Sequence, residues 1–472
     1  MIHSFSPLRS RRILLLAAGL WALLFWTFRQ AAVGRRPDLR AYETSFPLAW
    51  KHLHSFNGTG GAWYIPETWI DDVAEPAQQQ QQPRTIVEAA RLAAQAAAKK
   101  PARQMDHARI PLLVHQTWAT ARIDAWSPMA LHCVERWLAY AVGGAEDRRP
   151  GHGGDDNGNG NDPSMAYFFW DDEGVLAFVN EYEPAFAEAF VAYFTPVERA
   201  DIFRILVCKW FGGIYGDIDT EPLQHPAHWI HLADLATWRD PETKASYGRE
   251  TDDPPRDEEE AWSAPGENER PVRLLAGLEA DVDPASDAYW RMGYTYPVQL
   301  TQWAIAAAPQ HPVLEQFMDH VRAEVDKIDK VAAAADGTAT DDHNDHSDHS
   351  DAVVAAQVHH ADPLTRTGPA AITMAVSTYL ETNNGLRWNA VTGCKDGGKA
   401  KIVGDVLVFP ITGFSPGRGT YGNMGSKPVT DPDARLQHHA QGSWRKFDPK
   451  VELGKLCRSV LGLCKDWSKV PA

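Results

Sequence analysis

The chain has 472 residues, enough for one large domain or two domains of average size. Hydrophobic residues make up 44% of it and 18 residues are Trp, which is typical of a globular protein with many aromatic contacts. The formal net charge of −16 argues against a nucleic acid as the main partner, because binding phosphates requires a basic surface.

The N-terminal segment 13–28 is apolar except for Thr27. A helix rising about 1.5 Å per residue over this segment would nearly cross the hydrocarbon core of a bilayer, which is about 30 Å thick. Basic residues precede the segment and no acidic residue appears before Asp38, so we expect an uncleaved membrane anchor with residues 1–12 as a cytoplasmic tail. Small residues at 31–34 leave a cleaved signal peptide as the alternative.

Residues 29–107 are predicted to form a stem. They contain a glutamine run at 78–82, scattered prolines, and an alanine-rich stretch, Val87–Ala98, that is compatible with a helix. This composition is typical of a spacer between a membrane and a folded domain. The only glycosylation sequon begins at Asn57, which is consistent with a lumenal stem.

Two apolar runs predict the first strands of the folded part. Ile110–Val114 is followed by His115-Gln116-Thr117-Trp118, and Tyr167–Trp170 is followed by Asp171-Asp172. Ligands of open α/β sheets collect outside the carboxyl ends of strands, so the polar residues after the first run either face a ligand or cap the sheet. The two aspartates are interpreted as the N-terminal cap of a helix over Val175–Tyr182.

The stretch from Glu198 onward predicts a helix, a sharp break and a short strand. Ile202, Leu206 and Trp210 recur every four residues, which is typical of a helix packed on a sheet. Gly212-Gly213 ends this helix, and Ile214–Gly216 is predicted to be a strand.

Two carboxylates follow that strand, Asp217 and Asp219. Residues spaced i, i+2 on an extended segment face the same side, where the two carboxylates repel each other unless a cation lies between them. With a cation they form a hard-oxygen site suited to Mn²⁺ or Mg²⁺. A bare Asp-x-Asp is more often a solvated turn, but the preceding helix, glycine pair and aromatic strand favour a site.

This stretch resembles the signature of the glycosyltransferases with a DXD sugar-binding motif, a family that includes the fungal Golgi α-1,6-mannosyltransferases that initiate outer chains on N-glycans. The run from Ile110 to Trp118 resembles the opening block of the same family, and seven ordered blocks in all cover most of residues 108–447. The resemblance implies an α/β fold of the GT-A type, with a mostly parallel nucleotide-sugar-binding sheet and flanking helices. It places the catalytic domain at residues 108–472.

The resemblance also implies roles for individual residues. Asp201 and Arg204 would hydrogen-bond the donor sugar, although a surface salt bridge between them is the alternative. Asp217 and Asp219 would hold the metal and the nucleotide ribose. The nucleotide and the donor sugar would be lined by His115, Trp118, Tyr215, Ser443 and Trp444.

The remaining blocks supply the acceptor side and the third metal ligand. Asp281 either binds an acceptor hydroxyl or caps a turn, and Pro297–Ala308 is predicted to be a helix that carries Gln302 and Trp303 toward the acceptor. By resemblance, a C-terminal histidine completes the metal site. The spacing to Gly442 points to His439, with His438 as the alternative.

Polar insertions are expected near 146–163, 237–271 and 336–362. The last contains His343, His346 and His349 among aspartates, which could bind Zn²⁺ or Cu²⁺ weakly, but we interpret it as a flexible insert. Among the five cysteines, Cys457 and Cys464 could pair in an oxidising lumen, and Cys208 is expected to be a buried thiol.

The function implied by the resemblance is a single-pass type II Golgi membrane enzyme that is metal-dependent and retaining. We expect it to transfer mannose from GDP-mannose to a glycan or glycoprotein, with UDP-galactose or UDP-glucose as the alternative donor. Two rival hypotheses are an inactive relative that acts as a scaffold in a Golgi transferase complex, and a lumenal metal-binding protein that uses the histidine run at 341–351.

Overall fold

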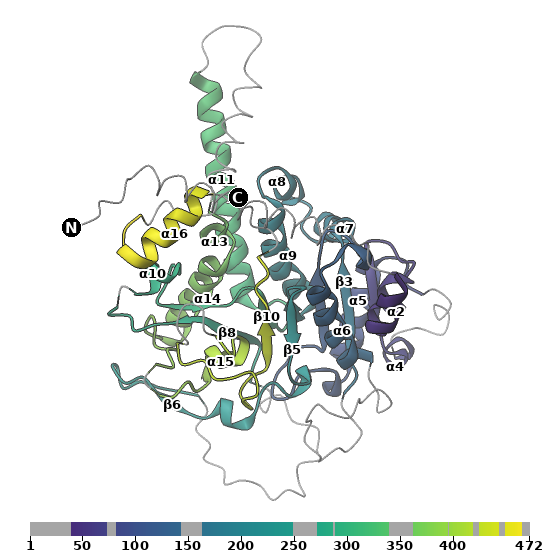
Figure 1. Ribbon diagram of the computed structural model, residues 1–472, viewed down its shortest axis with the longest axis horizontal. Helices are drawn as coiled ribbons and strands as arrows, with labels where there is room; N and C mark the ends of the chain where they lie inside the picture. The colour runs from purple at the N-terminus through teal and green to yellow at the C-terminus, as the bar shows by residue number, and fades with distance from the viewer. Residues whose placement is uncertain are drawn as a thin grey trace, which may run out of the picture.

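A nine-stranded mixed sheet organises the chain, as the computed structural model shows (Figure 1). The structure describes residues 39–72, 82–142, 163–248, 271–286, 288–338, 362–394, 396–418, 424–442 and 449–464. The expected anchor at 13–28, the histidine run at 341–351, and Ser443 and Trp444 lie outside the described residues. Within the described ranges no helix is both long enough and apolar enough to cross a membrane.

The strands of the sheet follow the order β1-β3-β2-β4-β10-β8-β12-β11, and β9 pairs with β8. Their bounds are β1 (Gly61–Tyr64), β2 (Leu113–Thr117), β3 (Ala166–Trp170), β4 (Gly213–Gly216), β8 (Leu274–Asp281), β9 (Val298–Leu300), β10 (Ala304–Ala307), β11 (Lys401–Val403) and β12 (Val406–Phe409). β2 runs parallel to β3 and to β4, and β8 runs parallel to β12. Because β10 is antiparallel to both β4 and β8, these two strands are parallel to each other, and β2, β3, β4, β8 and β12 share one direction. The expected α/β fold with a largely parallel central sheet is therefore confirmed.

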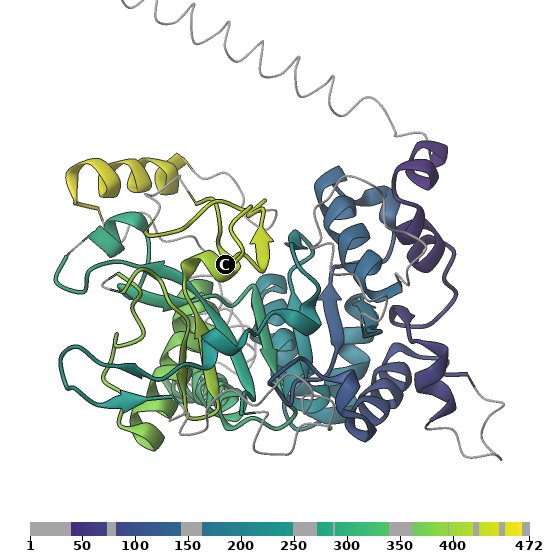
Figure 2. The same cartoon turned by 90° about the horizontal axis from the view of Figure 1, so that it is seen from below.

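Helices cover both faces of the sheet. The longer ones are α5 (Ile86–Lys99), α6 (Pro128–Val142), α7 (Asp172–Tyr182), α9 (Pro196–Phe211), α11 (Pro312–Thr338) and α14 (Pro369–Asn384). α5 contacts β1 and β3, and α9 contacts β2, β4 and β10. α6 packs on β3 and β5 (Thr220–Pro222) from the other side (Figure 2). All five residues of β3 are buried, as expected for a strand covered on both faces.

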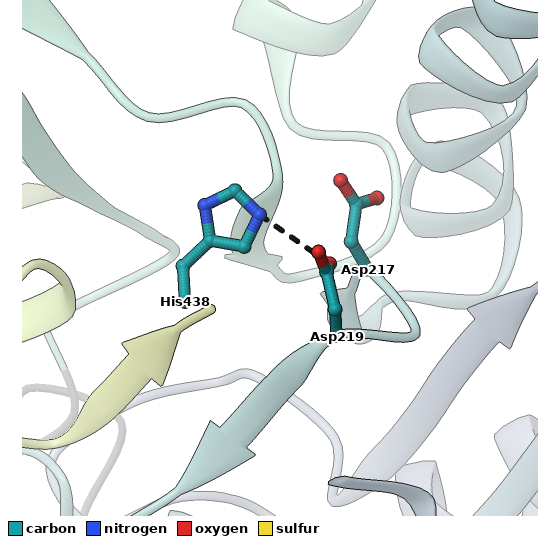
Figure 3. Close-up of side chains that lie close together, drawn as sticks. All are labelled: Asp217, Asp219 and His438. Atoms are coloured by element: carbon teal, nitrogen blue, oxygen red, sulfur yellow. Dashed lines mark ion pairs between the residues drawn. The ribbon is translucent and has the colours of Figure 1, made fainter. Parts of the chain in front are cut away.

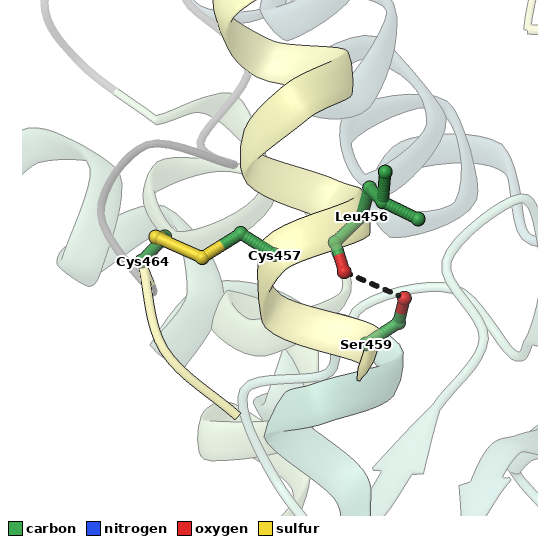
Figure 4. The surroundings of a disulfide bond; sticks show 4 residues. All are labelled: Leu456, Cys457, Ser459 and Cys464. Atoms are coloured by element: carbon green, nitrogen blue, oxygen red, sulfur yellow. Dashed lines mark hydrogen bonds between the residues drawn. A yellow bond between two sulfur atoms is a disulfide. The ribbon is translucent and has the colours of Figure 1, made fainter. Parts of the chain in front are cut away.

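Shorter elements complete the fold. They are α2 (Leu39–Ser45), α3 (Pro47–Ala49), η1 (Trp50–His54), α4 (Glu67–Asp71), η2 (Pro101–Arg103), η3 (Ile123–Ala125), α8 (Ala187–Ala192), η4 (Pro226–His228), η5 (Leu232–Leu235), β6 (Trp238–Arg239), β7 (Ser246–Tyr247), α10 (Ala288–Met292), α13 (Pro363–Arg366), α15 (Ile411–Phe414), β13 (Leu436–His438) and α16 (Pro449–Leu461). β13 pairs with β5, and β6 pairs with β7. A disulfide joins Cys457 of α16 to Cys464, as the sequence suggested (Figure 4).

The stem assignment was wrong for the described part of residues 29–107. β1 adds to the edge of the sheet by pairing Gly61 with Trp170. α5 begins with a capping box between Thr85 and Glu88, and five of its alanines are fully buried: Ala89, Ala90, Ala93, Ala96 and Ala97. Small side chains let this helix approach the sheet closely, so a composition that resembles a linker in fact forms part of the core.

Two predicted elements differ from the structure. The first strand is β2, which begins three residues later than expected and therefore contains His115 and Gln116. Pro297–Ala308 is not a helix. It forms β9 and β10, whose backbone groups pair with β8 and β4 and whose side chains are buried. Alanine favours helices, but this local preference is small, and strand pairing within the folded domain outweighs it.

Other local predictions are confirmed. α9 ends at Phe211, directly before the glycine pair. Asp171 caps α7, because its side chain accepts a hydrogen bond from the backbone N–H of Gly174 at 2.9 Å. Cys208 is fully buried on α9.

Candidate active site

The turn from α9 into β4 brings the predicted donor-side residues together. Gly212 and Gly213 have φ angles of 70° and 101°, a left-handed conformation that glycine adopts without strain. A Cβ on Gly213 would lie 2.4 Å from the carbonyl oxygen of Leu113. Only glycine therefore fits this close contact between β4 and β2. The chain reverses at once, and Asp217 lies beside the middle of α9, at Arg204.

Arg204 links the two predicted carboxylates of this turn. Its Nη2 donates a hydrogen bond to Oδ1 of Asp217 at 3.0 Å and lies 3.2 Å from Oδ1 of Asp201. The hydroxyl of Tyr215 donates to the same oxygen of Asp217 at 2.9 Å. The side chains of Arg204 and Asp201 are only 7% and 8% exposed, so their pair is not a solvated surface salt bridge.

The electrostatics of this cluster follow from burial and charge. Burial raises the pKa of Asp201 to about 7, although the charge of Arg204 opposes the shift. Burial also raises the pKa of Asp217, again against the charge of Arg204. Burial alone would raise the pKa of Asp219, but a hydrogen bond and charge from His438 outweigh it and the pKa is lowered. The site thus concentrates negative charge around one buried guanidinium.

Asp217, Asp219 and His438 form a candidate cation site (Figure 3). One ligand atom from each lies within 4.8 Å of the others, and Nε2 of His438 lies 3.3 Å from Oδ1 of Asp219. Two carboxylate oxygens and one imidazole nitrogen are a donor set that fits Mn²⁺. The residues present therefore fit a divalent cation.

The structure places His438, and not His439, at this cluster. β13 pairs with β5 so that His438 lies opposite Thr220, immediately after Asp219. Successive side chains of a strand point to opposite faces, so the next residue turns away. Nε2 of His439 instead lies 3.1 Å from Oε2 of Glu221.

Trp303 and Gln302 join the donor-side residues and do not line an open acceptor surface. The Trp303 ring stacks on the imidazole of His438, with centroids 4.4 Å apart, and the side chain is 6% exposed. The side-chain amide of Gln302 donates to the carbonyl of Thr367. The Thr367 hydroxyl in turn donates to Oδ2 of Asp201 at 3.0 Å.

The sequence analysis did not identify Thr367 and Gln441, which bind Asp201 and Asp219. Thr367 directly precedes Gly368-Pro369, where α14 begins, and this local pattern does not show that its hydroxyl reaches Asp201. Gln441 carries no sequence signal, because it contributes a backbone N–H, which donates to Oδ2 of Asp219 at 2.9 Å.

His115 belongs to the core and has no exposed surface for a nucleotide. Its Nε2 lies 3.1 Å from the carbonyl oxygen of Gly212, and the indole N–H of Trp170 donates to its Nδ1 at 3.3 Å. Burial lowers the pKa of His115 to about 3, so the ring is neutral at physiological pH. It ties β2 to the glycine break, while Trp118 lies partly exposed just beyond the strand.

Asp281 does not cap the turn that follows it but holds a loop 111 residues further along the chain. Its carboxylate is buried and accepts hydrogen bonds from the hydroxyl of Thr392 and the backbone N–H of Gly393, at 2.5 and 2.8 Å. These contacts fold the loop after α14 onto the end of β8. The carboxylate is therefore engaged within the protein.

Similarity to known proteins agrees with the site. Residues 159–235 match the family described as "Glycosyltransferase sugar-binding region containing DXD motif". The chain is 32% identical to the initiation-specific alpha-1,6-mannosyltransferase of Schizosaccharomyces pombe, over 60% of this chain and 57% of that protein. Proteins with the same name from Candida albicans and Saccharomyces cerevisiae are 27% and 23% identical. Those matches cover 56% and 72% of this chain, and 57% and 79% of the respective relatives.

These similarities confirm the resemblance drawn from the sequence motifs. The chain spans little more than half the length of the first two relatives. The matched family region contains α9, the glycine break and both aspartates of the candidate cation site.

Proposed function

Because the chain carries the sugar-binding region of the glycosyltransferases with a DXD motif, we propose that it is a metal-dependent, retaining mannosyltransferase with a GT-A fold. The donor is GDP-mannose and the acceptor is a glycan or glycoprotein, joined in α-1,6 linkage. UDP-galactose and UDP-glucose are the alternative donors. The enzyme is a single-pass type II Golgi membrane protein anchored by residues 13–28. The names of the three relatives support the sugar and the linkage.

The observation that carries the proposal is the cluster of Asp217, Asp219 and His438 next to the buried Asp201–Arg204 pair. A divalent cation bound there supplies charge neutralisation for a nucleoside diphosphate leaving group. Arg204 adds a positive charge that is held in place by two carboxylates and by the Tyr215 ring, 5.0 Å away. Asp201, fixed by Thr367, is oriented to accept a hydrogen bond from a sugar hydroxyl.

The test is donor hydrolysis by the purified full-length chain in detergent. GDP-mannose, UDP-galactose, UDP-glucose and UDP-N-acetylglucosamine are each supplied with Mn²⁺ or with EDTA, beside an Asp219→Asn variant. We expect GDP-mannose alone to be consumed, only with metal, and not by the variant. If a UDP-sugar is consumed instead, the protein is still a glycosyltransferase, but its donor is not GDP-mannose.

An inactive relative that serves as a scaffold in a Golgi transferase complex is the competing hypothesis from another class. It predicts no turnover of any donor, with or without an added acceptor. Nucleotide binding that depends on Mn²⁺ but is never followed by turnover would favour this hypothesis over the enzyme.

A further inference from the structure

The C-terminal helix α16 and the residues after it carry a concentration of exposed apolar side chains. Of the nine large hydrophobic side chains exposed on the described part of the chain, five lie here, each more than half exposed: Leu453, Leu456, Val460, Leu461 and Leu463. Single exposed leucines are ordinary, but a contiguous group marks a surface that another apolar phase covers.

Three of these side chains form a stripe on one face of α16. At about 100° per residue, Leu453, Leu456 and Val460 lie within one third of the helix circumference. The buried residues Val451 and Gly454 lie on the face turned toward the protein, where α16 contacts α10. The disulfide between Cys457 and Cys464 folds the chain back after the helix (Figure 4).

The charged side chains of α16 lie apart from its apolar stripe. The helix carries three basic residues (Lys450, Lys455 and Arg458) against a single acidic one (Glu452), in a chain whose formal net charge is −16. Lys455 pairs with Glu452 and Arg458 donates to the carbonyl of Arg291, on the side away from the stripe. The stripe itself therefore presents an apolar surface of the kind that an interfacial helix buries in a bilayer. A second copy of this chain carries the same formal net charge of −16, so the two copies repel each other overall.

The position of α16 agrees with the expected anchor. The described chain starts at Leu39, ten residues after the apolar segment 13–28 ends, so α2 can be at most about 35 Å from the end of that segment. Figure 2 shows α2 at the upper right and α16 at the upper left, on one side of the molecule. β13, which carries the cation-site residue His438, lies between them on that side.

We propose that the apolar face of α16 lies in the surface of a phospholipid bilayer and forms a second membrane contact that turns the active site toward the membrane. The proposal rests on the proposed attachment through residues 13–28 but not on catalytic turnover. It implies that acceptors displayed close to the bilayer are the ones within reach.

The test compares Val460, on the stripe, with the exposed Ser459, which lies about 100° around the helix from it. Val460→Cys places a fluorophore on the stripe, and Ser459→Cys places it at an exposed position off the stripe. Both are made in the full-length chain with the exposed Cys394 changed to Ser, under conditions that keep the Cys457–Cys464 disulfide. Leu456→Cys gives an independent second reading on the stripe if labelling at 460 disturbs the helix.

The labelled proteins are incorporated into phosphatidylcholine vesicles with and without a nitroxide-bearing lipid. We expect the lipid quencher to reduce fluorescence at 460 and 456 several-fold more than at 459. Equal quenching at all three positions would overturn the proposal. A blue-shifted emission at 460 without lipid quenching would also overturn it, because protein would then cover the face. Donor hydrolysis is measured separately. A chain that shows the expected quenching but no hydrolysis would contradict the proposed enzymatic activity and still support the contact of α16 with the membrane.

Discussion

The indole ring of Trp303 lies on the imidazole ring of His438, with ring centroids 4.4 Å apart and planes tilted by 24°. The carbonyl of the same tryptophan accepts a hydrogen bond from the backbone N–H of Asp217 at 2.9 Å. One residue of the segment between β9 and β10 thus fixes two of the three candidate cation ligands, which come from distant parts of the chain. Groups that orient metal ligands in this way strengthen metal binding.

Replacing Trp303 should weaken metal binding without removing a ligand. We expect Trp303→Ala to lower Mn²⁺ affinity about 10-fold, because the His438 ring loses the surface that orients it. Trp303→Phe keeps a stacking ring and should recover most of the affinity. Mn²⁺ titration followed by electron paramagnetic resonance measures binding directly, and equal affinity in all three proteins would contradict the positioning role.

Replacing His438 and replacing His439 should have different effects on Mn²⁺ affinity and donor turnover. His438→Gln removes a candidate ligand and should lower Mn²⁺ affinity and donor turnover by about 10-fold or more. His439→Gln, the matched control, breaks only the contact with Glu221 and should leave metal affinity close to that of the original chain. The opposite ranking in a calorimetric titration would restore His439 as the ligand.

Loss of Arg204 should cost both stability and activity. Arg204→Met leaves the carboxylates of Asp201 and Asp217 facing each other in a largely buried site, which should lower the free energy of unfolding by about 3–5 kcal/mol. The double variant with Asp201→Asn should recover part of that loss, because one of the two charges is removed. Urea unfolding measures the free energy of unfolding of both variants. If Arg204→Met is as stable as the original chain, the contacts of Arg204 with Asp201 and Asp217 do not stabilise the fold.

The hairpin β6–β7 provides a pH-dependent contribution to stability away from the site. Asp240 is buried, and Arg387 donates to both of its carboxylate oxygens, at 3.0 and 3.1 Å. The hydrogen bond from Arg387 lowers the pKa of Asp240 in the folded protein. Its stabilising effect is therefore fully present above the unfolded pKa of about 3.9 and is lost as the pH falls through the lower folded value.

Asp240→Asn should consequently flatten the fall in melting temperature below about pH 4 while lowering stability at neutral pH. Thermal unfolding monitored by circular dichroism between acidic and neutral pH checks both effects. A variant whose melting temperature falls as steeply with acid as that of the original chain would show that other groups dominate the acid response.

Two truncations separate the folded domain from any stem. Removal of residues 1–38, which include the proposed anchor, should leave a cooperatively folding protein, because every strand of the sheet and α5 are retained. Removal of residues 1–107 deletes β1 and α5, exposes β3 at the edge of the sheet and uncovers its core, so this shorter protein should aggregate or unfold. A folded, active chain starting at residue 108 would restore the stem assignment.

The sequence by itself determined the parts of the site that are built locally. The helical spacing of α9, the glycine pair and the i, i+2 aspartates specify helix, break and paired carboxylates within about twenty residues. Each of these features depends on backbone geometry over a few residues, so the pattern alone predicts it. The same holds for the Asp171 cap and for the short loop closed by Cys457 and Cys464.

Only the tertiary structure decided which distant residues meet there. The choice of His438 over His439 depends on the register of β13 against β5, because a shift by one residue would exchange the two side chains. The place of Trp303 depends on β10 inserting between β4 and β8, and the inclusion of α5 in the core depends on the sheet edge formed by β1 and β3. Such pairings are set by the packing of the whole domain, so composition and local periodicity do not predict them.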